Sequence, residues 1–282
     1  MTPELVGIAA PNFDLGLTLD CGQLFHWVPR GAGWIGLADR TPLYVEADGD
    51  KLLAPVGTEE ITRHFFALDH PLAEIYATFP QDEAMQAALA FCRGMRLVRQ
   101  PAWECLATFI TSAMKQVPHI RQISLQLRRR YGQPVEFAGT TLYTYPTPER
   151  LAECTEAELR ECKLGFRAKN LLGAAKLIAA GMVSLESIAT MDDETARAEL
   201  CRLPGVGEKV ANCALLFGFE RLRAFPIDVW IERILREIYF RKKRKVTTGR
   251  LRDFSNTYFG EYGGYAQQYL FHHARKTWKL SR

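Results

Sequence analysis

Hydrophobic and polar positions along the 282-residue chain change their period near residue 61. Before that point, short stretches alternate apolar and polar side chains between glycine or proline turns, a pattern typical of β-strands. Five stretches show it, at residues 13–20, 25–28, 34–37, 43–46 and 51–54. We therefore expect a small antiparallel sheet in the N-terminal part of the chain.

Beyond residue 61 the apolar spacing becomes helical, and Arg99-Gln100-Pro101 indicates the entry into the main helical body. The predicted fold class is therefore α+β. We expect a sheet domain with flanking helices in residues 1–98 and a helical domain in residues 99–282. With 48% hydrophobic residues, the chain can bury a full core.

A glycine turn joins two helical patterns near residue 205. Asp192 to Cys201 has helical spacing, Pro204-Gly205-Val206-Gly207 interrupts it, and helical spacing resumes from Glu208 to Phe217. The pattern predicts a helix-hairpin-helix. Gly205 and Gly207 can adopt positive φ and allow another backbone to approach, and free amides at the start of the second helix can hold a phosphate. A tight turn between two packed helices is the alternative.

Lys209 and Asp228 add chemistry to this turn. Lys209 lies in the first turn of the second predicted helix, where the helix dipole disfavours an ammonium group. A neutral amine can attack a sugar carbon and form a Schiff base. Asp228 is expected to cap another helix, whose amides would keep its carboxylate ionised and able to stabilise an oxocarbenium-like sugar. A solvated lysine and a plain cap are the alternatives.

The hairpin, Lys209 and Asp228 resemble the helix-hairpin-helix DNA glycosylases, most closely the 8-oxoguanine DNA glycosylase branch. The resemblance implies a bifunctional DNA glycosylase and AP lyase, which excises a damaged base and cleaves the strand by β-elimination through a lysine Schiff base. It also implies a sheet domain similar to half of the TATA-binding-protein fold, packed on two mainly helical domains. The active cleft would lie between these domains, and the predicted helix-hairpin-helix spans about residues 192–217.

Two distant segments match the lesion pocket of that family. Gly22 matches the glycine whose carbonyl accepts the N7 proton that 8-oxoguanine has and guanine lacks. Gln267 and Phe271, one helical turn apart, match the residues that bind the purine edge and stack on its ring. Cys213 matches the cysteine on the opposite side of the base. The alternatives are a turn glycine, a surface glutamine and two core residues.

Two other segments resemble the loops that brace DNA after base flipping. Phe166 matches an aromatic wedge and Arg167 matches an arginine that contacts the orphaned cytosine, while a helix start with a core phenylalanine is the alternative. Met114 and His119 replace an asparagine run and a later arginine of eukaryotic-type members, which weakens the expected discrimination for cytosine. Met114 can still act as a flexible apolar plug. Trp230 stands where a histidine is usual.

The hairpin backbone carries further expected contacts. Gly205, Gly207 and Val210 are expected to bind the DNA backbone. Carbonyls of the tight turn could hold a structural K⁺ or Na⁺, through Cys201, Leu203 and Val206.

No redox cofactor is required for the predicted reaction. The 7 cysteines are scattered, which favours reduced thiols. Some relatives hold an iron–sulfur cluster with four closely spaced cysteines near the C-terminus, but no cysteine follows Cys213, so we expect no cluster.

The net charge of +4 is small, but basic residues cluster. They are Arg121, Arg128, Arg129 and Arg130 along one predicted helix, and the run Arg241-Lys242-Lys243-Arg244-Lys245 with Arg250 and Arg252 close behind. Each cluster is either a solvated surface or a DNA-facing one that adds salt-dependent affinity.

The expected partner is double-stranded DNA that contains 8-oxoguanine, and we expect a monomer. Because the sequence shows no eighteen-residue apolar run and no secretory leader, we expect no membrane association. The location would be cytoplasmic and nucleoid-associated in a bacterium, or nuclear in a eukaryote. Two alternatives remain: a glycosylase of the same fold for another lesion, such as an alkylated purine, and a non-catalytic helix-hairpin-helix DNA-binding protein.

Overall fold

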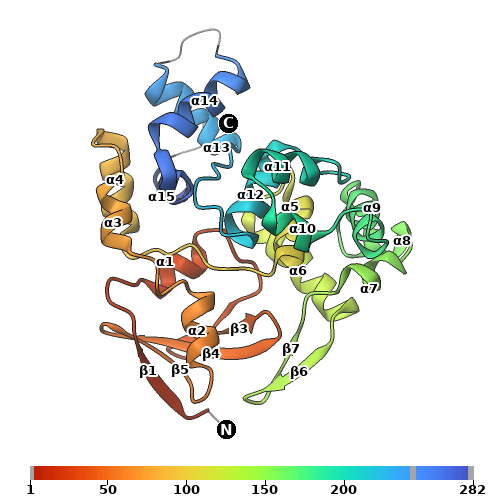
Figure 1. The fold of residues 1–282 in the computed structure, drawn as a ribbon. Helices are drawn as coiled ribbons and strands as arrows, with labels where there is room; N and C mark the ends of the chain where they lie inside the picture. Colours follow the sequence, from red (N-terminus) through yellow and green to blue (C-terminus); the bar gives the residue numbers. More distant parts are fainter. Residues whose placement is uncertain (1–2, 242–245, 279–282) are drawn as a thin grey trace.

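A five-stranded antiparallel sheet occupies the N-terminal part of the chain, as the alternating pattern predicts. The computed structural model describes residues 3–241 and 246–278. Strand order in the sheet is β1-β5-β4-β3-β2 (Figure 1). The strands are β1 (Leu5–Ala9), β2 (Val28–Arg30), β3 (Gly33–Ala38), β4 (Thr41–Asp48) and β5 (Lys51–Pro55). Buried residues alternate with less buried ones along the middle strands, at Leu43 and Val45 on β4 and at Leu52 and Ala54 on β5, so apolar side chains gather on one face.

Residues 13–20, which we predict as a strand, form helix α1 (Leu15–Asp20) instead. Asp14 caps the helix, because its carboxylate accepts a hydrogen bond from the Leu17 amide at 2.8 Å. Leu15 and Leu19 are buried together on one face while Leu17 is half-buried. The apolar residues Leu15, Leu17 and Leu19 therefore fit a short helix as well as a strand, and the Asp14 cap favours the helix.

One further strand prediction needs correction, and three strands were not predicted. Residues 25–27 lie in an irregular segment that buries Phe25 and Trp27, and β2 begins only at Val28. Strand β1 and a second, two-stranded sheet were not predicted; the second sheet pairs β6 (Pro134–Phe137) with β7 (Thr140–Tyr143). Arg30, at the end of β2, donates a hydrogen bond of 2.7 Å to the carbonyl of Ala138 in the β6–β7 turn, so the two sheets are joined.

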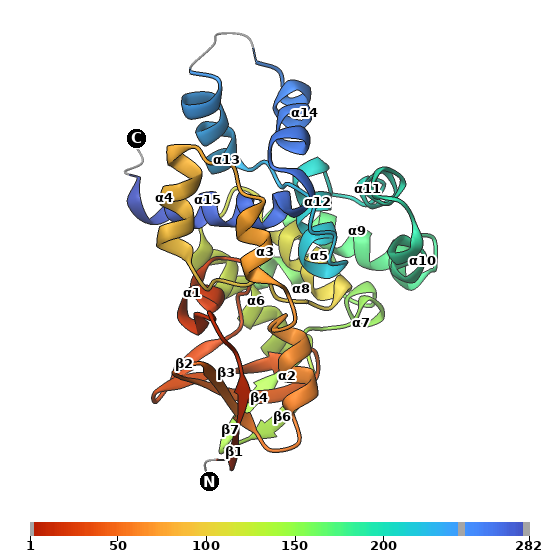
Figure 2. The ribbon, with the colours of Figure 1, turned by 60° about the vertical axis from the view of Figure 1, so that its left-hand side comes forward.

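The rest of the described chain is helical, which confirms the predicted α+β class (Figures 1 and 2). The helices after the sheet are α2 (Glu59–Phe65), α3 (Leu72–Ala77) and α4 (Glu83–Cys92). The central helices are α5 (Ala102–Ser112), α6 (Val117–Tyr131), α7 (Pro148–Ala152), α8 (Glu156–Glu161), α9 (Arg167–Ala179), α10 (Leu185–Thr190), α11 (Asp193–Cys201) and α12 (Glu208–Gly218). The last are α13 (Val229–Ile234), the π-helix η1 (Leu235–Tyr239), α14 (Thr248–Tyr258), the 3₁₀-helix η2 (Gly260–Tyr262) and α15 (Gly263–Thr277).

Helix α4 packs across α15, although the two are far apart in sequence (Figure 2). Of the helices that follow the sheet, α2 therefore packs on the sheet, whereas α4 packs on the C-terminal helix α15. Buried His70 strengthens this connection, because its ring nitrogens lie 2.7 Å from Tyr265 Oη and 2.7 Å from Glu220 Oε1. The segment between the sheet and the central helices is thereby fixed against both α15 and the residues after α12.

Two hydrophobic cores hold these layers. The smaller lies between the sheet and α2, where Trp27 stacks on Phe65 at a centroid distance of 5.6 Å. Gly36 makes room for that ring, since a Cβ there would lie 2.4 Å from Trp27. The larger core runs through the helices from α3 to α15. Within the described ranges, we find no helix with the length and apolar character that a membrane crossing requires.

Candidate active site

The predicted helix-hairpin-helix is present as α11 and α12. Asp192 caps α11 by accepting hydrogen bonds of 3.0 Å from two amides of its first turn. Gly205 has φ of +78°, and a Cβ there would lie 2.7 Å from Asn170 Cβ, so the turn requires glycine. Gly207 differs from the expectation: its φ is −103° and a Cβ would meet nothing within 4 Å. Its role is to leave the start of α12 open.

The exposed hairpin tip leaves room for a backbone ligand. Gly205 and Gly207 are exposed, but the side chain of Val210 is buried, so only its amide could contact DNA. The carbonyl of Leu203 already accepts the Val206 amide at 3.1 Å within the turn, and the side chains of Leu203 and Val206 are buried.

Lys209 is half-buried in the first turn of α12, whereas a plain solvated lysine would have an exposed side chain. Its Nζ lies 4.8 Å from the centroid of the Phe109 ring on α5, within reach of a cation–π contact. Phe109 stacks in turn on Phe217 at 5.6 Å. Two aromatic rings thus form an apolar floor beneath the amine.

Asp228 caps α13, as predicted. Its Oδ1 accepts hydrogen bonds from the amides of Trp230 at 3.1 Å and Ile231 at 2.9 Å. Two opposing effects act on the pKa of this carboxylate. Burial raises the pKa of Asp228 above its ordinary value, although the capping amides and the charge of Lys209 act in the opposite direction. A carboxylate with a raised pKa is a better proton acceptor.

One small cavity collects all the predicted catalytic and base-binding residues. Its lining consists of Gly22, Phe109, Lys209, Cys213, Phe217, Pro226, Asp228, Gln267, Gln268 and Phe271. These residues come from the α1–β2 segment, α5, α12, the α12–α13 connection and α15. The cavity has a volume of 40 Å³.

The polar atoms of this cavity are arranged to receive a ligand. Gln267 is buried, against the surface alternative, and its Oε1 accepts no hydrogen bond from the described residues. An unpartnered buried carbonyl oxygen is costly unless a ligand donates to it. Phe271 is half-buried at the cavity and not a closed core residue. Cys213 is buried, and burial raises the pKa of its thiol, so the thiol is neutral near pH 7.

Phe109, Phe217, Pro226 and Gln268 are lining residues that the sequence reasoning missed. The two phenylalanines have the helical spacing of ordinary core residues, and no local signal distinguishes them. Gln268 directly follows Gln267, and the sequence pattern does not show which of the two faces the base.

The two predicted DNA-bracing loops lie at the surface. Met114 has a positive φ of 55° and is 92% exposed, and Phe166 is 56% exposed, so Phe166 is not a core residue. His119 is exposed in the first turn of α6. Arg167 is buried, with its Nε donating to the carbonyl of Ala113 at 2.6 Å. Its guanidinium therefore holds the Met114 turn, and its contact with an orphaned cytosine stays a prediction.

The basic clusters are only partly available to DNA. Arg128 is buried in an ion pair with Glu104, so it lies on neither a solvated nor a DNA-facing surface. Arg252 pairs with Glu208 at 2.7 Å. Residues 242–245 of the C-terminal basic run lie outside the described residues.

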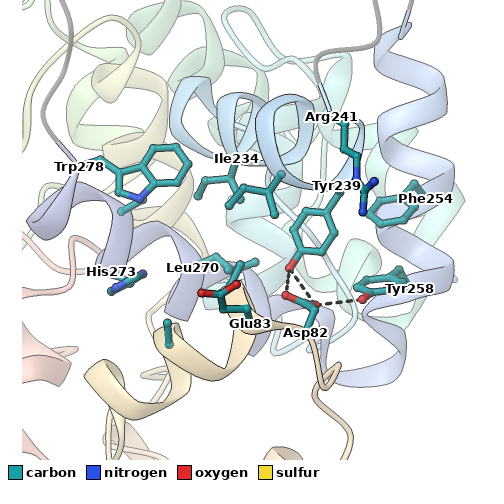
Figure 3. A pocket seen from close by; sticks show the side chains of 14 residues that line it. Asp82, Glu83, Ile234, Tyr239, Arg241, Phe254, Tyr258, Leu270, His273 and Trp278 are labelled. Atoms are coloured by element: carbon teal, nitrogen blue, oxygen red, sulfur yellow. Dashed lines mark hydrogen bonds between the residues drawn. The ribbon is translucent and has the colours of Figure 1, made fainter.

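A larger cavity, of 660 Å³, lies between α4 and the C-terminal helices (Figure 3). At its floor Asp82 accepts hydrogen bonds from Tyr239 and Tyr258. None of the predicted site residues lines it. Volume alone therefore does not identify the catalytic site in this protein.

Comparison with known proteins agrees with the geometry. Residues 107–256 match the model of the HhH-GPD superfamily base excision DNA repair proteins, and residues 5–106 match the N-terminal domain of 8-oxoguanine DNA glycosylase. The class is thus a helix-hairpin-helix base excision repair protein. Within that class, the chain belongs to the 8-oxoguanine DNA glycosylase/AP lyase family.

Relatives and solved structures cover most of the chain. A probable N-glycosylase/DNA lyase from Methanothermobacter thermautotrophicus is 33% identical over 79% of this chain and 77% of its own length. The apo-form of the Clostridium acetobutylicum 8-oxoguanine glycosylase/lyase has a TM-score of 0.90 and 32% identity, covering 97% of both chains. The same enzyme with double-stranded DNA containing cytosine opposite 8-oxoguanine has a TM-score of 0.89 and 31% identity, covering 96% of this chain and 97% of that one.

Proposed function

We propose that this protein is a bifunctional DNA glycosylase and AP lyase that excises 8-oxoguanine from duplex DNA. One observation carries the proposal: Lys209 and Asp228 open on the same cavity as Gly22, Cys213 and Gln267. A nucleophile, a carboxylate and hydrogen-bonding atoms for a purine thereby lie around one space. The family membership supports the same activity.

Recognition would use one backbone acceptor and one side-chain acceptor. The Gly22 carbonyl accepts no hydrogen bond from the described residues, so it is free to accept the N7 proton of 8-oxoguanine. Guanine would present a lone pair to this carbonyl instead, which is repulsive. Gln267 Oε1 would accept from the Watson–Crick edge of the purine, and Phe271 would stack on its ring.

Excision would follow from attack of the Lys209 amine on C1′ of the flipped nucleotide. The new N–C1′ bond forms as the glycosidic bond breaks, and the base leaves with the bonding electron pair and takes up a proton. Asp228 would stabilise positive charge that develops on the sugar and accept the proton that the amine loses. Opening of the sugar ring gives the Schiff base. Loss of a C2′ proton then breaks the C3′–O bond and releases the 3′ phosphate, which cleaves the strand.

The protein's own side chains supply these steps, and we propose that no cofactor is required. Met114 and Phe166 would brace the duplex where the base has left it. We also propose a monomer, with a K⁺ or Na⁺ held by the carbonyls of Cys201, Leu203 and Val206. A cytoplasmic, nucleoid-associated location is proposed for a bacterial source and a nuclear one for a eukaryotic source.

Borohydride trapping on an 8-oxoguanine duplex tests the proposal. We expect a covalent protein–DNA complex and strand scission, and Lys209→Gln should abolish both while DNA binding is retained. Lys176→Gln, which removes an exposed lysine on α9, is the matched control and should behave as wild type. Absence of both trapping and scission in the wild type would reject catalysis, and faster excision of an alkylated purine would reject the lesion assignment.

A further inference from the structure

We propose that Gln268 is a positioning residue that sets the direction of the Gly22 carbonyl and thereby the preference of the pocket for 8-oxoguanine. The inference rests on the proposed function. It concerns a residue of the pocket lining whose side chain donates a hydrogen bond to the protein backbone.

Gln268 holds the peptide that precedes Gly22. Its Nε2 donates a hydrogen bond of 3.0 Å to the carbonyl of Cys21, and both residues are buried. Because a peptide group is planar, fixing the Cys21 carbonyl also fixes the Gly22 amide. Gly22 then turns with φ of +90°, a conformation that glycine tolerates, and its own carbonyl is left free.

Gln23 fixes the other side of Gly22. Its Nε2 donates to the carbonyls of Thr18 at 2.9 Å and Arg96 at 2.8 Å, and its Oε1 accepts the Val98 amide at 3.0 Å. Because the residues before and after Gly22 are both held by hydrogen bonds, Gly22 has little conformational freedom. Loss of the bond on either side would let its carbonyl swing.

The anchor comes from the helix that also carries the base contacts. Gln267 and Gln268 are consecutive on α15, so their side chains leave the helix about 100° apart. Gln267, Gln268 and Phe271 all line the pocket. Gln268 also binds the segment before Gly22, as does Arg275, which donates to the Asp20 carbonyl. One helix therefore sets the distance between the two walls of the pocket.

This arrangement separates base recognition from strand cleavage. Recognition needs the Gly22 carbonyl in line with the N7 proton, so it depends on the Gln268 anchor. Scission of a preformed abasic site needs Lys209 and Asp228 but has no base to recognise. A loss of the anchor should therefore affect base excision and leave abasic-site scission intact, which a general loss of structure would not do.

The test compares wild type with Gln268→Met, which keeps the side-chain length but removes the donor. Single-turnover excision of 8-oxoguanine should fall about tenfold, the effect of one lost buried hydrogen bond. Scission of a preformed abasic site should stay within about twofold of wild type. Gln86→Met is the matched control, because Gln86 Nε2 donates to the Pro80 carbonyl at 3.1 Å, away from this pocket, and both activities should stay unchanged.

Retained abasic-site scission also shows that the variant is folded. If Gln268→Met does not fold, Gln268→Leu replaces it, since leucine is apolar and has no donor. Unchanged excision, or an equal loss of excision and scission, would overturn the inference. A wild type that cleaves abasic sites but does not excise 8-oxoguanine would instead overturn the proposed function.

Discussion

Asp228 has a structural role as a helix cap and a proposed chemical role. Its carboxylate caps α13 through two amide hydrogen bonds and lines the same cavity as Lys209. The cap requires only an oxygen acceptor, whereas stabilisation of a cationic sugar requires negative charge. These two roles can be separated by substitution, because asparagine and alanine remove different properties of the side chain.

We expect Asp228→Asn to lower 8-oxoguanine excision by at least about 100-fold, since the charge beside the developing cation is lost. Its thermal midpoint should stay close to wild type because asparagine is an equally good cap. Asp228→Ala should lose activity and also about 1 kcal/mol of the free energy of unfolding. Single-turnover kinetics and thermal denaturation measure the two effects. Full activity in Asp228→Asn would leave only the cap.

At the scale of elements, Arg167 joins the start of α9 to the turn after α5. Its guanidinium donates to the carbonyls of Ala113 and Leu164 and lies 4.2 Å from the centroid of the Phe166 ring. Burial lowers the pKa of the Arg167 guanidinium, and desolvation is the cause of this shift. Two exposed apolar side chains, Met114 and Phe166, are thereby held by a single buried cation.

We expect Arg167→Met to reduce 8-oxoguanine excision about tenfold, because the Met114 turn loses its anchor. Met114→Ala should reduce excision too, and the double variant should be less impaired than the product of the two single effects, since both act on one apolar plug. Arg63→Met, an exposed change on α2, is the control. Strictly multiplicative effects would show that Arg167 acts independently of Met114.

At the scale of the whole molecule, buried histidines connect parts of the chain. His26, His70 and His272 are buried, and burial lowers the pKa of each below its ordinary value, to about 4 for His272. The unfolded chain therefore binds more protons than the folded protein below about pH 6.5. The free energy of unfolding must then decrease as the pH falls through that range.

We expect the urea midpoint to be lower at pH 5 than at pH 7.5. His272→Gln should remove part of this pH dependence, while His64→Gln, an exposed change on α2, should leave it unchanged. Urea titrations followed by circular dichroism at several pH values measure the effect. A midpoint that does not change between pH 7.5 and pH 5 would contradict the linkage.

Local patterns predict the elements whose hydrogen bonds are local. The hairpin follows from the glycine turn and the Asp192 cap, and β3 to β5 follow from alternation between turns. Alternation fails at residues 13–20, where the cap at Asp14 favours a helix. It also misses β1 and the β6–β7 hairpin, because short strands become stable only when a partner strand is present.

The sequence by itself determined the chemistry of this protein: a lysine after a glycine turn, a capping aspartate and the residue types of a purine pocket. Only the tertiary structure decided that Gly22, Lys209 and Gln267 share one cavity, that Arg167 is turned inward, and that Gln268 holds the loop before Gly22. The physical reason is the distance along the sequence between the residues that interact. Caps and turns depend on bonds within a few residues, whereas burial and partners depend on which distant segments pack together.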